Sequence, residues 1–215
     1  MDFLPFEIYL STLDIEEYGV IYEIPDYFSE EELEICFNII EDNSPLNPDV
    51  YPNQSTDLRH LRIQNQVFYK DVSDKTLAMY KHYAEILAHS KSLQNKCTYV
   101  SEYNGTYTEG QLKFPSERLQ GSPKGMRPYP THNDGGKSLT CIVPLSPVKS
   151  VPTQFDGIRG DGKPVDLGWE VNKAYMFLAN DTYSYHSYEG DKDHDRWIAN
   201  INFYTKKSID DTPSV

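Results

Sequence analysis

The sequence contains little cysteine, few apolar residues and no long apolar stretch. Its three cysteines, Cys36, Cys97 and Cys141, are odd in number and far apart, which indicates neither a disulfide framework nor a cysteine zinc site. No run approaches the roughly 18 apolar residues of a membrane span, and the N-terminus lacks the basic start and apolar stretch of a signal peptide. We therefore expect a soluble, reduced, cytoplasmic protein without a membrane partner.

Basic residues are also in the minority. The 215-residue chain has 20 Lys and Arg against 33 Asp and Glu, a formal net charge of −13. This balance argues against nucleic acid and anionic membranes as partners. Hydrophobic residues make up only 38% of the chain, but 17 Tyr, 9 Phe and 2 Trp add apolar area to a core. A chain of this length and aromatic content is expected to fold.

Helical patterns occupy the first half of the chain. Ser29 and Glu32 form a Ser-x-x-Glu capping box with acidic residues in the first turn, where the helix dipole favours them. Apolar residues at helical spacing follow, so we expect a helix over 29–42. A second apolar face at the same spacing predicts a helix over 73–89.

After residue 96 the pattern alternates, as it does in strands. The predicted strands are 98–103, 139–145, 174–178, 184–188 and 198–204. Two Gly- and Pro-rich segments, 104–130 and 147–168, are predicted to be long loops. The first contains a locally basic stretch, 111–127, which is a candidate contact for an acidic substrate.

Helices first and strands afterwards predict an α+β fold. We expect one domain over 1–207, with helical support over 29–90, an all-β core over 97–205 and a C-terminal tail over 208–215. Trp169 and Trp197 are expected to pack in its core.

One group of residues predicts a metal site. His132-Asn133-Asp134 places an imidazole and a carboxylate two residues apart, and such positions project from the same face of a strand. A histidine from another strand would complete two histidines and a carboxylate around iron(II), with coordination positions left open. His186 lies in a tyrosine-rich alternating segment, and Arg196 follows ten residues later.

This order of residues resembles the 2-oxoglutarate/iron(II)-dependent oxygenases, especially the prolyl 4-hydroxylase-like branch. Their motif is His-x-Asp, a long gap, a second His and then an Arg or Lys; Asp134 and His186 are 52 residues apart. The resemblance implies a double-stranded β-helix, a jelly-roll or cupin-like barrel supported by N-terminal helices. It implies His132, Asp134 and His186 as ligands of Fe(II), and Arg196 as the partner of the distal carboxylate of 2-oxoglutarate.

The resemblance also implies O2 as a co-substrate and no catalytic residue beyond the metal ligands. Tyr129 lies three residues before His132, where relatives often have a tyrosine that lines the pocket. Thr140 shares a strand face with Asp134 if the alternation persists, and could hydrogen-bond the co-substrate. Asp134 itself favours hydroxylation, because the related halogenases replace this carboxylate with a small residue.

The predicted function is that of a 2-oxoglutarate-dependent dioxygenase that hydroxylates an aliphatic C–H bond. The substrate would be a residue of a peptide or protein, or a free amino acid or other small molecule. Two alternatives remain open: a non-catalytic jelly-roll binding module and a cupin-type metalloenzyme that does not use 2-oxoglutarate. His194 is a rival third ligand, but its charged turn favours a solvated histidine. Neither the individual substrate nor the oligomeric state follows from the sequence.

Overall fold

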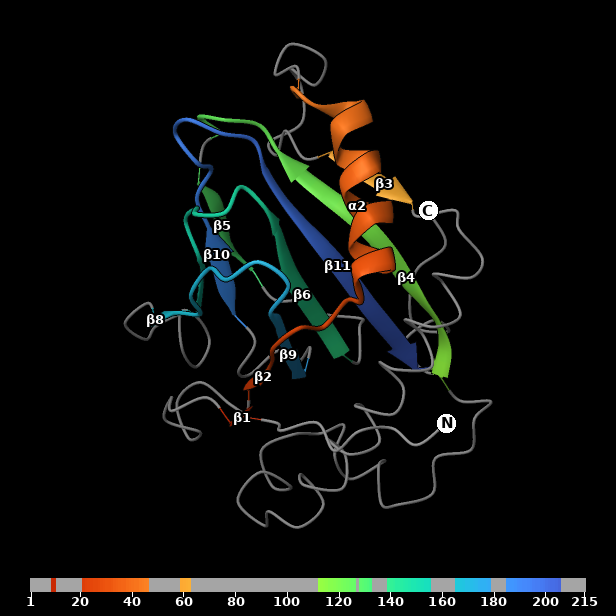
Figure 1. Ribbon diagram of the computed structural model, residues 1–215. Coiled ribbons are helices and arrows are strands. Elements are labelled where there is room, and N and C mark those ends of the chain that lie inside the picture. Colours follow the sequence, from red (N-terminus) through yellow and green to blue (C-terminus); the bar gives the residue numbers. More distant parts are fainter. Residues whose placement is uncertain are drawn as a thin grey trace, which may run out of the picture.

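The helix and strands that position the candidate residues form two antiparallel sheets and one helical layer (Figure 1). The computed structural model describes residues 9–10, 21–46, 59–62, 112–126, 128–132, 139–155, 165–178 and 185–205. The helix predicted over 73–89, the strand predicted over 98–103 and the predicted tail lie outside these residues. In the described part of the chain, no helix has the length and apolar character needed to cross a membrane.

The helix α2 (Glu30–Asn43) begins where the capping box predicts it. Ser29 Oγ accepts a hydrogen bond from the Glu32 backbone N–H at 3.3 Å, and Glu32 Oε2 accepts one from the Ser29 backbone N–H at 2.7 Å. Cys36 and Ile40, one turn apart, are buried on the same face. The predicted helix over 29–42 is confirmed.

Among the described residues, the larger sheet has seven strands in the order β1-β2-β9-β6-β11-β4-β3. These strands are β1 (Tyr9–Leu10), β2 (Ile21–Ile24), β9 (Ala174–Leu178), β6 (Leu139–Ser146), β11 (Arg196–Thr205), β4 (Leu112–Ser122) and β3 (Arg59–Arg62). Because β11 pairs with β4 on one side and β6 on the other, its backbone is hydrogen-bonded along both edges. The predicted strands 139–145, 174–178 and 198–204 are confirmed.

The smaller sheet has the order β5-β10-β7-β8. Its strands are β5 (Tyr129–His132), β10 (His186–Tyr188), β7 (Thr153–Phe155) and β8 (Val165–Asp166). The predicted strand over 184–188 is confirmed in its last three residues. The eight strands from β4 to β11 divide equally between the sheets, and β4 pairs with β11 as β5 pairs with β10. Pairing of the first strands of a series with its last is the connectivity of a jelly roll.

The prediction of two long loops was wrong. Segment 104–130 contains all of β4 and the start of β5, and segment 147–168 contains β7 and β8. Pro115 and Gly121 weakened the strand pattern of β4, but Pro115 lies where the pairing with β11 shifts register, a position that tolerates proline. The basic stretch 111–127 is accordingly mostly strand and not a loop.

The two faces of the larger sheet are both covered. Figure 1 shows α2 crossing in front of β4 and β11. On this outer face, Trp197 pairs with Gly121, where a Cβ atom would lie 2.7 Å from the indole and 2.9 Å from Leu46 Cδ1. Only glycine therefore leaves room for the indole.

The inner face packs against the smaller sheet. A buried apolar cluster, here called the inter-sheet core, draws residues from both sheets. Its members are Ile21, Ile142, Phe155, Leu167, Tyr175, Phe177 and Ile198, with Trp169 packed against them. The side chains of the smaller sheet that face this core are therefore shielded from water.

Candidate functional site

Two of the predicted ligands, His132 and His186, lie side by side in the smaller sheet. They are paired directly across β5 and β10, and their ring centroids are 4.3 Å apart. His186 is buried at 4% exposure, whereas His132 is partly exposed at the edge strand. Directly opposed residues of antiparallel strands project from one face. This histidine pair can therefore bind one ion from two strands.

The hydrogen bonding of His132 fixes which ring nitrogen is available. Nδ1 lies 2.9 Å from the backbone carbonyl oxygen of Pro130. A carbonyl only accepts, so Nδ1 carries the proton, and Nε2 keeps its lone pair in the neutral ring. Metal-binding histidines are commonly oriented in this way, with the second nitrogen donating to a carbonyl or carboxylate. His132 can offer Nε2 to a metal ion.

The third predicted ligand, Asp134, lies outside the described residues. Among the residues that the structure describes, no group of three or more His, Cys, Asp and Glu side chains is arranged to hold a metal ion. The structure thus brings two of the three predicted ligands together, and the ligand roles of all three stay predictions.

Tyr129 lies next to the histidine pair because of a bulge in β5. His132 pairs with His186 and Tyr129 with Tyr188, so β5 has one more residue than β10 over this interval. The extra residue places Tyr129 and His132 on one side, with ring centroids 4.5 Å apart. Tyr129 also stacks on Tyr188 at 5.0 Å. Its contact with a co-substrate stays a prediction.

Arg196 opens β11 and is enclosed by residues from three other segments. Its Nε donates a hydrogen bond to the carbonyl of Val151 at 3.2 Å, and its Nη2 donates one to Thr153 Oγ1 at 3.0 Å. The guanidinium carbon lies 4.7 Å from the ring centroid of Trp169 and 5.0 Å from that of Tyr188. We call Arg196, Thr153, Trp169 and Tyr188 the arginine cluster.

One nitrogen of this guanidinium makes no hydrogen bond within the described part of the chain. Arg196 is 1% exposed, and within the described part of the chain its Nη1 has no hydrogen-bond partner. Two other buried side-chain atoms share that condition, Ser122 Oγ and Trp197 Nε1, but only Arg196 carries a formal charge. Ser122 is the cross-strand partner of Arg196. A buried charge with an unused donor costs free energy until an anion completes it.

The charge of Arg196 survives its burial. Burial lowers the pKa of Arg196 to about 10, while the nearby Tyr188 and Asp191 act in the opposite direction. The guanidinium is therefore protonated at neutral pH. Thr153 Oγ1 accepts from Nη2, which leaves the hydroxyl hydrogen of Thr153 to donate. Arg196 Nη1 and the Thr153 hydroxyl together can bind one carboxylate.

Strand β10 fixes the distance between the histidine pair and the arginine cluster. His186 and Tyr188 lie on the same face of β10, and two residues along an antiparallel strand span about 6.8 Å. Across β7 they pair with Phe155 and Thr153 respectively. Phe155 and Phe177 also pack on the His186 ring, at 5.7 and 5.4 Å between centroids. The histidine pair and the arginine cluster are therefore about one strand repeat apart, and apolar rings pack beside His186.

The inner face also holds a chain of polar side chains that the sequence analysis missed. Gln120 Nε2 donates to the Tyr188 hydroxyl at 3.1 Å, and Asn200 Nδ2 donates to Gln120 Oε1 at 3.2 Å. These bonds tie Tyr188 to β4 and β11. Alternating polar residues on the predicted strand 198–204 were the available signal, but they did not identify Gln120 as the partner.

Thr140, the other predicted co-substrate contact, is fully buried on β6. It pairs with Phe177 and lies two residues from Ile142, both in the inter-sheet core, so its side chain lies on the inner face. Whether it shares that face with Asp134 lies outside the described residues, and its contact with a co-substrate stays a prediction.

Two predictions about single residues have clear outcomes. Trp169 packs against the inter-sheet core as predicted, but it also contacts Arg196, which the sequence analysis did not foresee. His194 is exposed in the turn between β10 and β11, and its Nδ1 lies 3.4 Å from Asp191 Oδ1. The prediction of a solvated turn histidine is confirmed.

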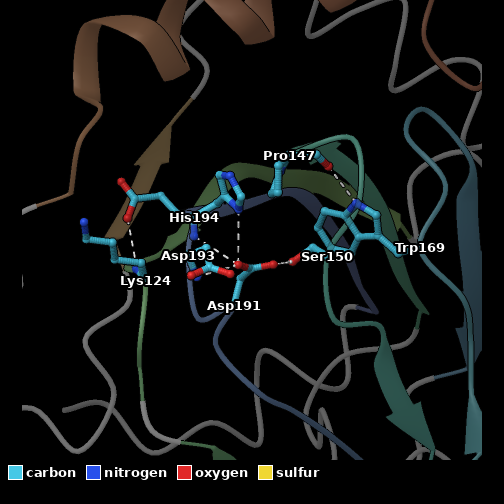
Figure 2. A network of polar contacts seen from close by, with 8 residues as sticks. Lys124, Pro147, Ser150, Trp169, Asp191, Asp193 and His194 are labelled. Carbon is cyan, nitrogen blue, oxygen red and sulfur yellow. Dashed lines mark hydrogen bonds and ion pairs between the residues drawn. The ribbon is translucent and has the colours of Figure 1, made fainter.

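Asp191 holds the turn that precedes Arg196 (Figure 2). Its carboxylate accepts hydrogen bonds from the backbone N–H groups of Asp193 and His194 and from the hydroxyl of Ser150, at 2.9, 3.0 and 2.9 Å. Burial acts to raise the pKa of Asp191, but these hydrogen bonds together hold it below its ordinary value. The turn is thus fixed by an ionised carboxylate.

Asp195, the residue directly before Arg196, joins the turn to two distant segments. Its carboxylate accepts the backbone N–H of Leu46 at 2.6 Å and that of Lys124 at 2.9 Å. The start of β11 is therefore connected to the chain after α2 and to the chain after β4. These contacts fix the position of the residue that directly precedes Arg196.

Comparison with known proteins identifies the fold. No family model matches the sequence, and no curated protein matches it either. Solved structures do match over most of the chain. A prolyl-4-hydroxylase from Pseudomonas putida superposes with a TM-score of 0.53 at 12% identity, covering 90% of this chain and 96% of that one.

Two further matches come from other sources. The viral collagen prolyl hydroxylase of Paramecium bursaria Chlorella virus-1, in its 2OG complex, gives a TM-score of 0.53 at 13% identity over 86% of this chain and 96% of that one. A prolyl hydroxylase from Trichoplax adhaerens, in complex with a hypoxia inducible factor oxygen degradation domain peptide fragment, gives 0.54 at 10% identity over 90% and 87%. The chain therefore has the fold of the prolyl 4-hydroxylases, which are 2-oxoglutarate/iron(II) oxygenases.

Proposed function

We propose that this protein is an iron(II)- and 2-oxoglutarate-dependent dioxygenase that hydroxylates an aliphatic C–H bond. The observation that carries the proposal is the buried Arg196 guanidinium, whose Nη1 is unpartnered among the described residues. The guanidinium lies beside Tyr188 and Thr153, which pair across β10 and β7. Two residues further along β10 is His186, which is directly opposite His132. The prolyl hydroxylase fold supports the same class of reaction.

The described residues offer two imidazoles for a metal ion and a buried guanidinium for a carboxylate, which supports the proposal. His132 and His186 would hold iron(II), with Asp134 as the carboxylate ligand, and Arg196 with Thr153 would hold the distal carboxylate of 2-oxoglutarate. When bound, iron(II) and 2-oxoglutarate supply the activation of O2, with decarboxylation to succinate and transfer of one oxygen atom to the substrate. Nε2 of His132 is oriented for this task by the Pro130 carbonyl.

The protein contributes position and the exclusion of water. Phe155 and Phe177 pack on the His186 ring and shield that imidazole from water on the inner side of the site. The arginine cluster fixes the opposite end of the co-substrate by a charge-assisted hydrogen bond. Because both ends are held on strands of the scaffold, the reacting atoms have a fixed orientation.

For the substrate, we propose a residue in a peptide or protein, with a free amino acid as the second candidate. His132 ends β5, the edge strand of the smaller sheet, and Pro130 and Thr131 beside it are exposed. The metal end of the site is therefore reachable from solvent, while the arginine end is enclosed. The Trichoplax enzyme, of similar fold, is seen with a peptide fragment.

The test is an anaerobic titration of the iron(II)-loaded protein with 2-oxoglutarate. We expect a weak visible charge-transfer band, which reports chelation of the metal by the co-substrate. The band should be lost in His186→Ala, which removes a ligand. In Arg196→Met the band should require a much higher concentration while iron binding is kept.

The remaining outcomes separate the alternatives. Iron binding by the wild-type protein without the band at any 2-oxoglutarate concentration would favour a cupin-type metalloenzyme with another chemistry. Failure to bind iron would favour a binding module without turnover. If the band is seen, succinate release in the presence of a peptide panel, and then of free amino acids, identifies the substrate class.

A further inference from the structure

We propose that Trp169 is a positioning residue for Arg196, and that it determines which length of dicarboxylate the arginine cluster accepts. The inference rests on the proposed function, because the dicarboxylate in question is its co-substrate. It goes further in naming a residue, outside the metal ligands and their charge partner, that sets the specificity of the distal end.

The indole of Trp169 is itself held in place. Trp169 lies between β8 and β9, and its Nε1 donates a hydrogen bond to the carbonyl of Pro147 at 2.7 Å, a contact drawn in Figure 2. The ring packs against the inter-sheet core. It therefore presents a fixed surface to the Arg196 guanidinium, whose carbon lies 4.7 Å from the ring centroid.

The contacts of Arg196 fall into two kinds with different effects. The hydrogen bonds to Val151 and Thr153 hold one edge of the guanidinium, through Nε and Nη2. They still permit the plane to tilt about that edge. The rings of Trp169 and Tyr188 oppose such a tilt, because a cation is attracted to the faces of both. The position of the remaining nitrogen, Nη1, therefore depends on the rings.

The two tryptophans of the chain differ in a way that supports this role. Trp197 is 1% exposed and fills the space beside Gly121, as a packing residue does. Trp169 is only partly buried, yet its polar atom is hydrogen-bonded and its ring lies on the buried charge of Arg196. Its surroundings match a residue that orients a functional group.

The consequence is a fixed reach between Nη1 and the histidine pair. One chain length of dicarboxylate then fits with both ends bound, and a longer one has to buckle. Without the indole, the guanidinium plane would be able to tilt. The shorter dicarboxylate would then bind less tightly, and the longer one would be tolerated better. Specificity for length, and not affinity alone, distinguishes this role from general packing.

The experiment measures the affinities of iron(II)-loaded protein for 2-oxoglutarate and for 2-oxoadipate, which is one methylene longer, under anaerobic conditions. The variants are Trp169→Leu and Trp169→Phe, with Phe37→Leu as the control. Phe37 is an exposed aromatic residue on α2, so the control removes a ring from another element of the fold. Iron affinity and thermal unfolding are measured in parallel.

We expect Trp169→Leu to weaken 2-oxoglutarate binding roughly tenfold, the size of a partly desolvated cation–π contact. Binding of 2-oxoadipate should weaken less, so that the ratio of the two affinities narrows, with iron affinity unchanged. Trp169→Phe, which keeps a ring, should restore most of the wild-type ratio, and Phe37→Leu should keep all of it. An unchanged ratio in Trp169→Leu, or the same change in Phe37→Leu, would overturn the inference.

A second measurement serves if Trp169→Leu does not fold. Trp169 and Trp197 are the two tryptophans of the chain. Anaerobic addition of 2-oxoglutarate should change the fluorescence of the wild-type protein, and the change should be absent in Trp169→Phe, where only the indole beside Gly121 remains. A change that persists in Trp169→Phe contradicts the inference. If the wild-type protein binds neither dicarboxylate, the proposed function itself has failed.

Discussion

The two faces of β11 bury residues of opposite character to the same depth. Arg196 and Trp197 are neighbours in sequence, and each is 1% exposed. The outer face continues with the apolar Ala199 and Ile201, whereas the inner face adds a charge and a hydrogen-bonded amide, Asn200, to the apolar Ile198 of the inter-sheet core. Apolar burial stabilises a fold, but burial of an incompletely paired charge opposes it. The outer face therefore contributes apolar packing alone, whereas the inner face combines apolar packing with the buried polar groups of the candidate site.

The largest effect on stability is expected on the outer face. Trp197→Ala removes a fully buried indole that fills the space above Gly121, so the free energy of unfolding should fall by about 3–5 kcal/mol. Denaturant unfolding measures the loss. A fall of less than about 1 kcal/mol would mean that the face repacks, and the contrast between the two faces would be weaker than the structure indicates.

On the inner face, Arg196→Met should separate stability from binding. The substitution removes two hydrogen bonds but also removes a buried charge, so the free energy of unfolding should fall by no more than about 1 kcal/mol. The affinity for 2-oxoglutarate should fall roughly 30-fold or more, because a carboxylate loses its charged partner. Unfolding and anaerobic titration of the same preparation test both. A large loss of stability would place Arg196 with the packing residues.

Asp195 connects the start of β11 to two distant segments, and its removal should have an intermediate effect. Asp195→Ala leaves the backbone N–H groups of Leu46 and Lys124 without their acceptor, which should lower the free energy of unfolding by about 1–3 kcal/mol. Asp193→Ala, an exposed position in the same turn, serves as the control and should stay within about 0.5 kcal/mol of the wild type. Equal losses in the two variants would contradict the assignment.

A smaller effect is expected at Ser29, which belongs to neither face of β11. Ser29→Ala removes the acceptor of the Glu32 N–H and opens the capping box, at a cost of about 1 kcal/mol. The affinity for 2-oxoglutarate should not change. A changed affinity would show that the end of α2 influences the inner face, which the contacts described above give no reason to expect.

The smallest effect concerns the pH dependence contributed by Asp191. Its pKa in the folded protein is lowered, so its contribution to stability is complete above the ordinary value of 3.8 and is lost as the pH falls through the lowered value. Unfolding free energies of wild type and Asp191→Asn, compared from pH 7 downwards, should therefore converge in this acidic range. A constant difference across it would contradict the ionised hydrogen-bonded carboxylate.

Local signals were sufficient for part of this structure. The capping box predicted the start of α2, because Ser29 and Glu32 are three residues apart and interact within one turn. The alternating strands β6, β9 and β11 were predictable for the same reason: their burial follows the period of two along each strand. The order of His132, His186 and Arg196 predicted residues that the fold does place on neighbouring strands and on adjoining parts of one site.

The remainder depends on contacts between distant segments. Pro115 and Gly121 weaken the strand pattern of β4 in the sequence, and β4 is a strand because β11 and β3 pair with it. The bulge that brings Tyr129 beside His132 has no local signature, since it follows from the register with β10. Thr153 lies in a predicted loop, and Trp169 contacts Arg196 from another part of the chain. Each of these residues contributes to the site through long-range packing.

The turn between β10 and β11 lies within the ten-residue interval from His186 to Arg196 and holds these two residues at a fixed separation. Asp191 and Asp195 fasten this turn to Ser150, Leu46 and Lys124, so its length behaves as a rigid spacer. A residue inserted into or deleted from the turn would break these hydrogen bonds or change the distance between the guanidinium and the imidazoles. The interval therefore sets the distance between the guanidinium and the imidazoles, and a site for a longer or shorter ligand would need a turn of different length.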